Sequence, residues 1–108
     1  NDKLIGSFGV MGGQYQAAGH AYVLSQIIDF GLSPQQALNY PSVFPNNNIL
    51  DFENKFDKDV IDDLALRGHE INHPAPPIGG GQMILIDNGR DVLIGASDWR
   101  KDGLAIGY

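Results

Sequence analysis

Two adjacent glycines, Gly12 and Gly13, form the part of this sequence best suited to chemistry. They follow an apolar segment over residues 4–10, expected to be a strand, and precede a helix expected over residues 14–30. Glycine has no Cβ, so a ligand can approach the backbone closely, and free N–H groups at a helix start favour negative charge. The sequence therefore predicts a corner that binds phosphate or carboxylate, or serves as an oxyanion hole.

The same glycine pair has two other interpretations. A nucleotide-binding loop would need the G-x-G-x-x-G spacing or the lysine of a P-loop, and Gly9-x-x-Gly12-Gly13 has neither. A tight turn that lets helix and strand pack closely would need glycine for steric reasons alone. The local sequence leaves the tight turn and the anion or oxyanion role open.

The segment His69-Glu70-Ile71-Asn72-His73 matches the H-E-x-x-H pattern of zinc proteases. That chemistry requires a helix, so that both imidazoles meet one metal while the glutamate polarises its water. Here Gly68 is expected to end a helix, Pro74 follows directly, and residues 70–72 are expected to be extended. The two histidines would then lie about 13 Å apart, at roughly 3.3 Å per residue, which is too far to share a zinc. A zinc hydrolase using His69, Glu70 and His73 is the weaker alternative, and we predict no metal site.

Two further side chains are candidates for catalysis or binding. His20 falls within the expected long helix, where a structural histidine is commoner than a catalytic base. Arg100 could form a structural salt bridge to Asp98 or Asp102, or could clamp a substrate carboxylate with its planar guanidinium. No serine stands at a nucleophile elbow, so the sequence does not predict a Ser-His-Asp triad.

The composition excludes several classes of function. The 108 residues carry a net charge of −6 with scattered Lys and Arg, which argues against nucleic acid and against an anionic membrane as partners. There is no cysteine, which excludes disulfides and thiol chemistry. No apolar run approaches the roughly 20 residues needed to span a bilayer. The length predicts a single domain over residues 1–108, and the start without Met suggests a piece of a longer protein.

The first half of the chain is expected to be mainly helical. In the long helix the apolar residues recur at helical spacing and are expected to pack on a sheet: Ala17, Ala21, Leu24, Ile27 and Ile28. Gly31 then ends this helix. A short second helix begins at Ser33-Pro34-Gln35-Gln36, where a capping box can form, and ends before Pro41.

The second half is expected to contain most of the strands. A turn at Pro45 and the following asparagines leads to a strand over residues 49–53, and Asp57 caps a third helix that packs through Val60, Ile61 and Leu64. A hairpin of residues 82–87 and 90–96 is expected around Asn88-Gly89, with a final strand over residues 104–108. Helices early and antiparallel strands late predict an α+β fold.

Several segments together resemble the gamma-glutamyltransferase family. They are Gly9-Val10-Met11-Gly12-Gly13, Ile27-Ile28-Asp29-Phe30-Gly31, Gln36-Ala37-Leu38-Asn39-Tyr40-Pro41, and the closing Gly95-Ala96-Ser97-Asp98, Arg100-Lys101-Asp102-Gly103 and Gly107-Tyr108. Each motif alone is weak, but together, in the right order and with the right gaps, they are specific and cover nearly the whole chain. The Met-Gly-Gly form is most similar to the amidohydrolase or acylase-like members.

The resemblance implies an N-terminal-nucleophile hydrolase with an αββα sandwich, in which helices pack on a mainly antiparallel sheet. Such a protein is made as a precursor that cleaves itself into a large and a small subunit, and this chain would be the C-terminal part of the small subunit. The family's nucleophile is the Thr exposed at the start of the small subunit, whose own α-amine serves as base. This sequence contains no threonine, so the nucleophile, like the serine pair that helps to bind substrate, must lie upstream of Asn1 or be absent.

The resemblance also assigns site residues. Gly12 and Gly13 match the glycine pair whose N–H groups form the oxyanion hole, and Arg100 matches an arginine that could approach the carboxylate end of the substrate. The chain departs from the family at two places, since Pro41-Ser42 replaces Pro-Arg and Asp98-Trp99-Arg100 replaces Asp-Pro-Arg. These departures bear on local ion pairing and on the placement of Arg100.

We therefore expect a C-terminal fragment of an amide hydrolase or acyltransferase that acts on γ-glutamyl or related amides. It needs no cofactor, and its partners are the rest of the small subunit and the large subunit, or a second copy of itself. Alone it should be inactive, with an open sheet edge and an exposed core face. The alternative is a non-catalytic binding or assembly remnant of the same fold.

Overall fold

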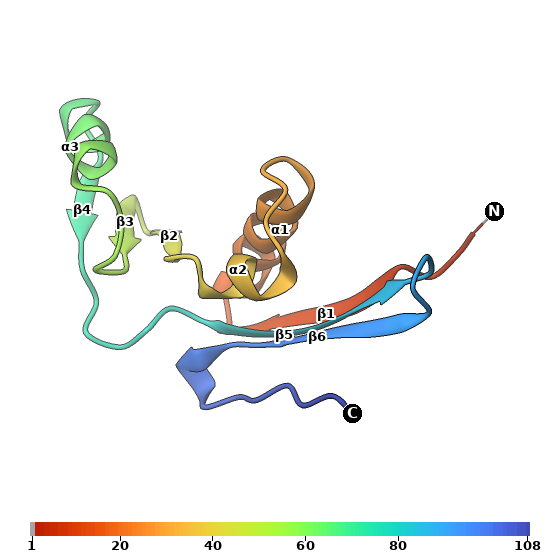
Figure 1. The fold of residues 1–108 in the computed structure, drawn as a ribbon. Helices are drawn as coiled ribbons and strands as arrows, with labels where there is room; N and C mark the ends of the chain where they lie inside the picture. The colour runs from red at the N-terminus through yellow and green to blue at the C-terminus, as the bar shows by residue number, and fades with distance from the viewer. Residues whose placement is uncertain (1) are drawn as a thin grey trace. The chain divides into compact units, whose positions relative to one another are not determined.

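The computed structural model describes residues 2–108 and divides them into two compact units. The first unit comprises the chain up to Tyr40 together with Gly79–Tyr108, and the second comprises Pro41–Ile78. Figure 1 labels the elements of both units, which are described one at a time below. A single domain over residues 1–108 stays a prediction.

The first unit is built on a three-stranded antiparallel sheet. Its strands are β1 (Gly6–Met11), β5 (Gly80–Asp87) and β6 (Val92–Ser97), in the order β1-β5-β6. The helices α1 (Tyr15–Ile28) and α2 (Pro34–Asn39) lie on one face of this sheet, as Figure 1 shows. The core fills the space between them, with buried side chains from sheet and helices that include Val10, Met83, Ala96, Tyr15, Val23, Ala37 and Leu38. The predicted α+β class with helices on an antiparallel sheet is confirmed.

The long helix forms as expected, but the prediction of its packing face was wrong. Its buried residues are Tyr15, Gly19, Val23 and Gln26. The predicted stripe of Ala17, Ala21, Leu24 and Ile28 lies on the opposite side at about 100° per residue, with Leu24 44% and Ile28 70% exposed. The helix is apolar on two sides, so its periodicity could not decide which side meets the sheet. Apolar character all round is typical of a helix that is covered on both sides.

The predicted start and end of α2 are confirmed. The Ser33 side chain accepts from the backbone N–H of Gln36 at 3.3 Å, and the Gln36 side chain accepts from the backbone N–H of Ser33 at 2.9 Å. These two bonds are the capping box. The helix ends at Asn39, and Tyr40, which precedes Pro41, is extended as expected for a residue before proline.

The β5–β6 hairpin forms, but its turn is longer than expected. Asp87 pairs with Val92, so four residues connect the strands instead of the Asn88-Gly89 pair alone. The Asp87 side chain accounts for the difference, because its Oδ1 accepts from the N–H groups of Gly89 at 2.9 Å and Arg90 at 3.1 Å. A carboxylate that bonds the backbone two residues on stabilises this wider turn.

The expected final strand over residues 104–108 is absent. After β6 the chain makes a 3-10 turn, η1 (Trp99–Lys101), and residues 103–108 run without regular structure on the side of the sheet away from the helices (Figure 1). There Ala105 lies over β6, 3.2 Å from where a Cβ on Gly95 would stand. The segment thus lies against a face of the sheet instead of extending its edge.

The second unit has its own sheet, in the order β2-β3-β4, and one helix. The strands β2 (Val43–Asn46) and β3 (Ile49–Phe52) are antiparallel, and β4 (Glu70–Asn72) pairs parallel to β3. The sequence did not predict β2, because Pro45 indicated a turn; β2 is an edge strand, where proline is tolerated. Asn47 and Asn48 both have positive φ, of 49° and 67°, and make the two-residue hairpin turn.

The helix α3 (Lys58–Leu66) begins at its predicted cap, where the Asp57 side chain accepts from the N–H of Asp59 at 2.9 Å. Ile61 and Leu64 are partly buried, but Val60 is exposed, so its expected packing was wrong. The helix ends before Gly68, which has a φ of 93°. Within residues 2–108, no helix of either unit is both long and apolar enough to cross a membrane.

Candidate functional site

The Gly12–Gly13 corner joins the edge strand β1 to α1. Gly12 has a φ of 132° and Gly13 a φ of 58°, so both glycines adopt left-handed conformations. Their carbonyls begin the helix, accepting from the N–H groups of Tyr15 and Gln16 at 3.1 Å each. In residues 2–108, no acceptor bonds the N–H of either glycine, and both glycines are exposed. The corner therefore offers two adjacent donors at the start of a 14-residue helix.

The buried ring of Tyr15 holds this corner in place. A Cβ on Gly79 would stand 2.4 Å from the ring, one on Gly19 2.6 Å, and one on Gly12 3.2 Å. Each of these glycines therefore provides room that a side chain would fill. Gly13 differs, because nothing lies within 4 Å of its Cβ position. Packing explains Gly12, whereas the backbone conformation alone requires Gly13 to be glycine or a residue that tolerates positive φ.

His20 links α1 to the edge of the sheet. Its Nε2 accepts from the N–H of Val10 at 3.2 Å, which leaves the proton on Nδ1 for a bond to the carbonyl of Gln16 at 2.6 Å. Its ring also packs against Phe8, with the centroids 5.3 Å apart. Because β1 pairs only with β5 in the described chain, His20 provides an acceptor that the edge would otherwise lack. The structural interpretation of His20 is the one these contacts support.

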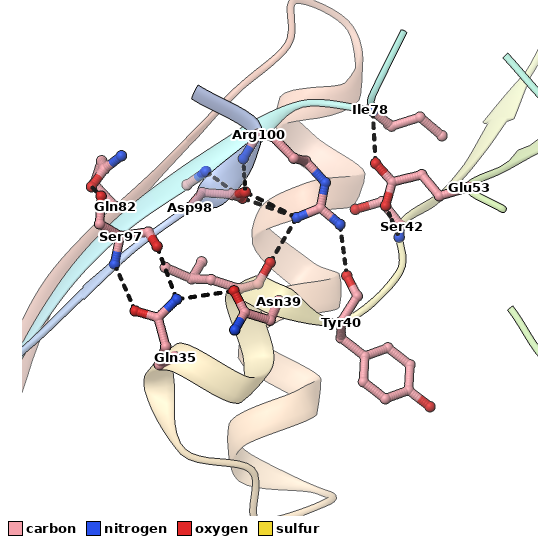
Figure 2. A network of polar contacts seen from close by, with 12 residues as sticks. Gln35, Asn39, Tyr40, Ser42, Glu53, Ile78, Gln82, Ser97, Asp98 and Arg100 are labelled. Carbon is pink, nitrogen blue, oxygen red and sulfur yellow. Dashed lines mark hydrogen bonds and ion pairs between the residues drawn. The ribbon is translucent and has the colours of Figure 1, made fainter. Parts of the chain in front are cut away.

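Arg100 forms the predicted salt bridge to Asp98, and Figure 2 shows it between that carboxylate and the end of α2. The two side chains are 2% and 4% exposed. The Nη1 atom of Arg100 donates to Oδ1 of Asp98 at 3.0 Å and to Oδ2 at 3.2 Å. It also donates to the carbonyl of Leu38 at 2.7 Å, while Nη2 donates to that of Tyr40 at 2.9 Å. The guanidinium thus satisfies carbonyls at the helix C-terminus, where positive charge is favourable.

Asp98 extends the same network to the sheet and to η1. Its Oδ2 accepts from the N–H of Gly81 on β5 at 3.0 Å, and its Oδ1 from the N–H of Arg100 at 2.9 Å. The ion pair therefore fastens α2, β5 and η1 to one another. Contact between Arg100 and a substrate carboxylate stays a prediction, and it would require the guanidinium to leave these partners. Trp99 lies beside the guanidinium, with its ring centroid 4.9 Å from Cζ of Arg100.

Gln35 has a role that the sequence did not reveal. Its Oε1 accepts from the N–H of Ser97 at 3.1 Å, and its Nε2 donates to the carbonyl of Ser97 at 2.9 Å (Figure 2). The amide thus bonds the edge of β6 as a neighbouring strand would. Nε2 also donates to Oδ1 of Asn39 at 3.0 Å. The spacing of Gln35 and Asn39 was visible in the sequence, but Ser97, the distant partner of Gln35, was not.

In the second unit, the H-E-x-x-H segment is not helical. Glu70–Asn72 is β4, as the sequence predicted, and Nδ1 of His73 lies 3.0 Å from the carbonyl oxygen of Phe52. Across residues 2–108, no group of three or more His, Cys, Asp or Glu side chains is arranged to hold a metal ion. The helical geometry that a zinc protease requires is therefore not formed by His69 and His73.

At Pro41-Ser42 the sequence departs from the family pattern that it resembles, and here Glu53 bonds the backbone within the second unit. Its carboxylate accepts from the N–H of Ser42 at 2.8 Å and from that of Ile78 at 2.9 Å, as Figure 2 also shows. The N–H of Glu53 in turn donates to the carbonyl of Ser42 at 3.1 Å. Backbone amides here provide the donors for this carboxylate.

The arrangement of helices on an antiparallel sheet is shared with known acylases and transpeptidases. Cephalosporin acylase from Bacillus halodurans matches all of this chain with a TM-score of 0.88 and 39% identity, over 21% of its own chain. Gamma-glutamyltranspeptidase from Pseudomonas nitroreducens, complexed with L-DON, matches all of it with a TM-score of 0.85 and 21% identity, over 56% of its own chain. The fold is thus that of the N-terminal-nucleophile hydrolases.

The sequence comparisons identify the family. The Acylase ACY 1 proenzyme of Pseudomonas sp. (strain V22) is 31% identical over 80 residues, which are 74% of this chain and 14% of that protein. The family model of gamma-glutamyltranspeptidase matches residues 1–108. The chain belongs to the gamma-glutamyltranspeptidase family, and its acylase-like character, inferred from the Met-Gly-Gly motif, is confirmed by these relatives. It spans about a seventh of the length of the acylase proenzyme.

Proposed function

We propose that this chain is the C-terminal part of a gamma-glutamyltransferase-like amide hydrolase or acyltransferase, in which Gly12 and Gly13 form the oxyanion hole. The observation that carries this proposal is that two adjacent, exposed glycines have N–H groups with no acceptor among residues 2–108. They stand at the start of a helix, where a developing negative charge is stabilised. Family membership indicates the reaction in which such a charge develops.

The reaction begins with a threonine upstream of Asn1. Its hydroxyl attacks the amide carbonyl while its own α-amine accepts the proton, and the carbonyl oxygen becomes an oxyanion. The N–H groups of Gly12 and Gly13 donate to that oxygen. The amine leaves with a proton, and water or a second amine then releases the acyl group. Loss of one such donor typically lowers kcat by about 10² to 10³.

The substrate class and the partners follow from the same relatives. One relative is a cephalosporin acylase and others are gamma-glutamyltranspeptidases, so we propose a γ-glutamyl or related amide as substrate. An acivicin-inhibited gamma-glutamyltranspeptidase, 25% identical over 95% of this chain, is described as relying on its C-terminus for autoprocessing and catalysis. The exposed apolar side of α1 supports a partner that covers it, namely the rest of the small subunit and the large subunit, or a second copy.

The chain alone would then be inactive, because it holds the oxyanion donors without a threonine. The same absence would favour the second candidate, a non-catalytic binding or assembly remnant, if the natural chain starts at Asn1. Native mass spectrometry of the natural protein, with N-terminal sequencing of each component, separates the two. A component that begins with Thr and contains or accompanies this chain supports the enzyme, whereas a natural chain that starts near Asn1 without a partner supports the remnant.

The role of the glycine donors has its own test in the assembled protein. Replacing Gly13 by glycolic acid exchanges its N–H for an ester oxygen and leaves the rest of the backbone unchanged. We expect kcat to fall about 10²-fold or more with little change in KM, because the donor acts in the transition state. The same exchange at Gly107, an exposed glycine in the C-terminal segment, is the control. Equal kcat values for the two esters would exclude the oxyanion role of Gly13.

A further inference from the structure

His20 bonds both ends of the short segment that carries the Gly12–Gly13 donors. Before the two glycines, the N–H of Val10 donates to Nε2 of the imidazole at 3.2 Å. After them, the carbonyl of Gln16 accepts from Nδ1 at 2.6 Å. One imidazole ring therefore closes a loop around the corner, with the proposed oxyanion donors inside it.

This clamp requires a neutral imidazole. In the neutral ring, one nitrogen carries a proton and donates, while the other accepts. In the protonated ring both nitrogens are donors, so Nε2 would face the N–H of Val10 as a second donor. The bond to Val10 would then be lost, whereas the bond to Gln16 would remain. Histidine is the side chain that ordinarily takes up such a proton between roughly pH 5 and pH 8.

The elements around His20 bring no charged side chain to the ring. Within residues 2–108, β1 and α2 pack closely against α1, and neither of them contains an Asp, Glu, Lys, Arg or second His. On α1 itself, the other titratable side chains are the phenols of Tyr15 and Tyr22. Asp29 follows the C-terminal end of the helix, about 13 Å along its axis at roughly 1.5 Å per residue. Protonation thus removes the Val10 bond without a compensating ion pair from these elements.

Loss of this bond would change the corner and leave the helix on the sheet. Val10 is also held by packing, since a Cβ on Gly19 would stand 2.7 Å from its Cγ1. The ring of Tyr15 packs beside Gly12. Neither contact depends on a proton. Opening the clamp therefore frees the connection over residues 11–14 while α1 stays in place.

We propose that His20 is a positioning residue that makes the Gly12–Gly13 corner sensitive to pH. With the ring neutral, the clamp holds the N–H groups of both glycines in one arrangement. Protonation opens the clamp, and the two donors no longer converge on one oxygen. This inference rests on the proposed function, since it concerns the donors that would receive the oxyanion. His20 acts through the corner and takes no part in proton transfer.

The first test follows the corner without catalysis. In the natural protein that contains this chain, nitrogen NMR of the His20 ring reports its protonation, and the amide signals of Gly12 and Gly13 report the corner. We expect both glycine signals to shift with the protonation of the ring as the pH falls from about 8 to about 5. In His20→Gln, an uncharged side chain that can also accept from Val10, they should stay constant. The control His69→Gln, at an exposed histidine of the second unit, should behave as the parent does.

The second test measures hydrolysis of γ-glutamyl-p-nitroanilide as kcat/KM at each pH. The amine of the nucleophile also titrates, so each variant is compared with the parent at the same pH. We expect the ratio of His20→Gln to the parent to rise about three- to tenfold from about pH 8 to about pH 5, because only the parent loses a net hydrogen bond. The ratio of His69→Gln to the parent should stay constant.

Three results would overturn the proposal: glycine signals that do not follow the ring, a ring that stays neutral down to about pH 5, or a constant His20→Gln ratio in an active protein. Coupled signals in a protein that does not hydrolyse the amide support the role of His20 and count against the enzyme. Hydrolysis without coupled signals supports the enzyme and excludes the pH sensitivity of His20. If His20→Gln does not fold, the signals of the parent still decide between these outcomes.

Discussion

Replacing Arg100 by methionine tests whether the buried ion pair holds the first unit together. The change removes both hydrogen bonds to the end of α2 and leaves the Asp98 carboxylate buried without its cation. Loss of one partner from a buried pair costs about 3 to 5 kcal/mol. Asp98 keeps the N–H groups of Gly81 and of residue 100, so we expect the lower end, about 3 kcal/mol. That is a large share of the roughly 5 to 15 kcal/mol that stabilises a domain.

The matched control is Arg90→Met, which makes the same chemical change in the same unit. The Arg90 side chain is 82% exposed, and its Nε lies 3.8 Å from Oδ2 of Asp87. Its loss should therefore cost under about 0.5 kcal/mol. Urea denaturation followed by far-UV circular dichroism gives both free energies of unfolding, with the slope m checked for two-state behaviour. Arg100→Lys, which keeps the charge but not the planar donors, should lose about 1 to 2 kcal/mol and remain folded if the methionine variant does not.

A second substitution separates the ion pair from simple loss of packing. Adding Asp98→Asn to Arg100→Met removes the uncompensated charge while an oxygen remains to accept from Gly81. We expect the double variant to recover about 1 to 2 kcal/mol relative to Arg100→Met. If Arg100→Met costs no more than Arg90→Met, or if the double variant is less stable than Arg100→Met, the reasoning about a buried, compensated charge is wrong.

Three further substitutions test individual contacts of the first unit. Gly19→Ala should destabilise by about 1 to 2 kcal/mol in thermal unfolding although alanine favours helices, because its Cβ would stand 2.6 Å from the Tyr15 ring. Gln35→Glu should cost about 1 to 3 kcal/mol by urea titration, since the carboxylate cannot donate to the carbonyl it faces, and Gln35→Ala should cost less. His20→Phe should raise the hydrogen exchange rate of the Val10 amide about tenfold, as that N–H loses its acceptor; an unchanged rate would show that another group protects it.

The features predicted correctly from the sequence are those that depend on near neighbours. The capping box at Ser33, the Asp57 cap, the extended segment before Pro74 and the hairpin around Asn88 each involve groups within a few residues. The chemistry of each is complete in the local sequence, so pattern and propensity are enough. Even there, the predicted length of the turn was wrong. The Asp87 carboxylate at the end of β5 stabilises a four-residue turn in place of the two-residue turn that Asn-Gly favours.

The features that the sequence did not reveal depend on distant partners. Arg100 bonds Leu38 from 62 residues away, and Gln35 bonds Ser97 across the same separation. The inward side of α1 was also undetermined, since both sides are apolar. The side that meets the sheet contains Gly19, where a Cβ would stand 2.7 Å from Cγ1 of Val10 on β1. The tail over residues 104–108 alternates like a strand, yet it lies across a sheet face with all five residues exposed. Local propensity cannot predict such contacts, because tertiary packing decides them.

The tight-turn interpretation of the glycine pair explains Gly12 but not Gly13. A Cβ on Gly12 would meet Gly79 and Tyr15, so any side chain there would deform the corner whatever the function. Gly13 has open space around its Cβ position and a φ of 58° that asparagine also adopts. Packing therefore gives no reason for a second glycine. The positive φ is the reason that the structure itself supplies for Gly13. A ligand that approaches the two N–H groups, as the proposed function requires, would be a second reason for glycine there.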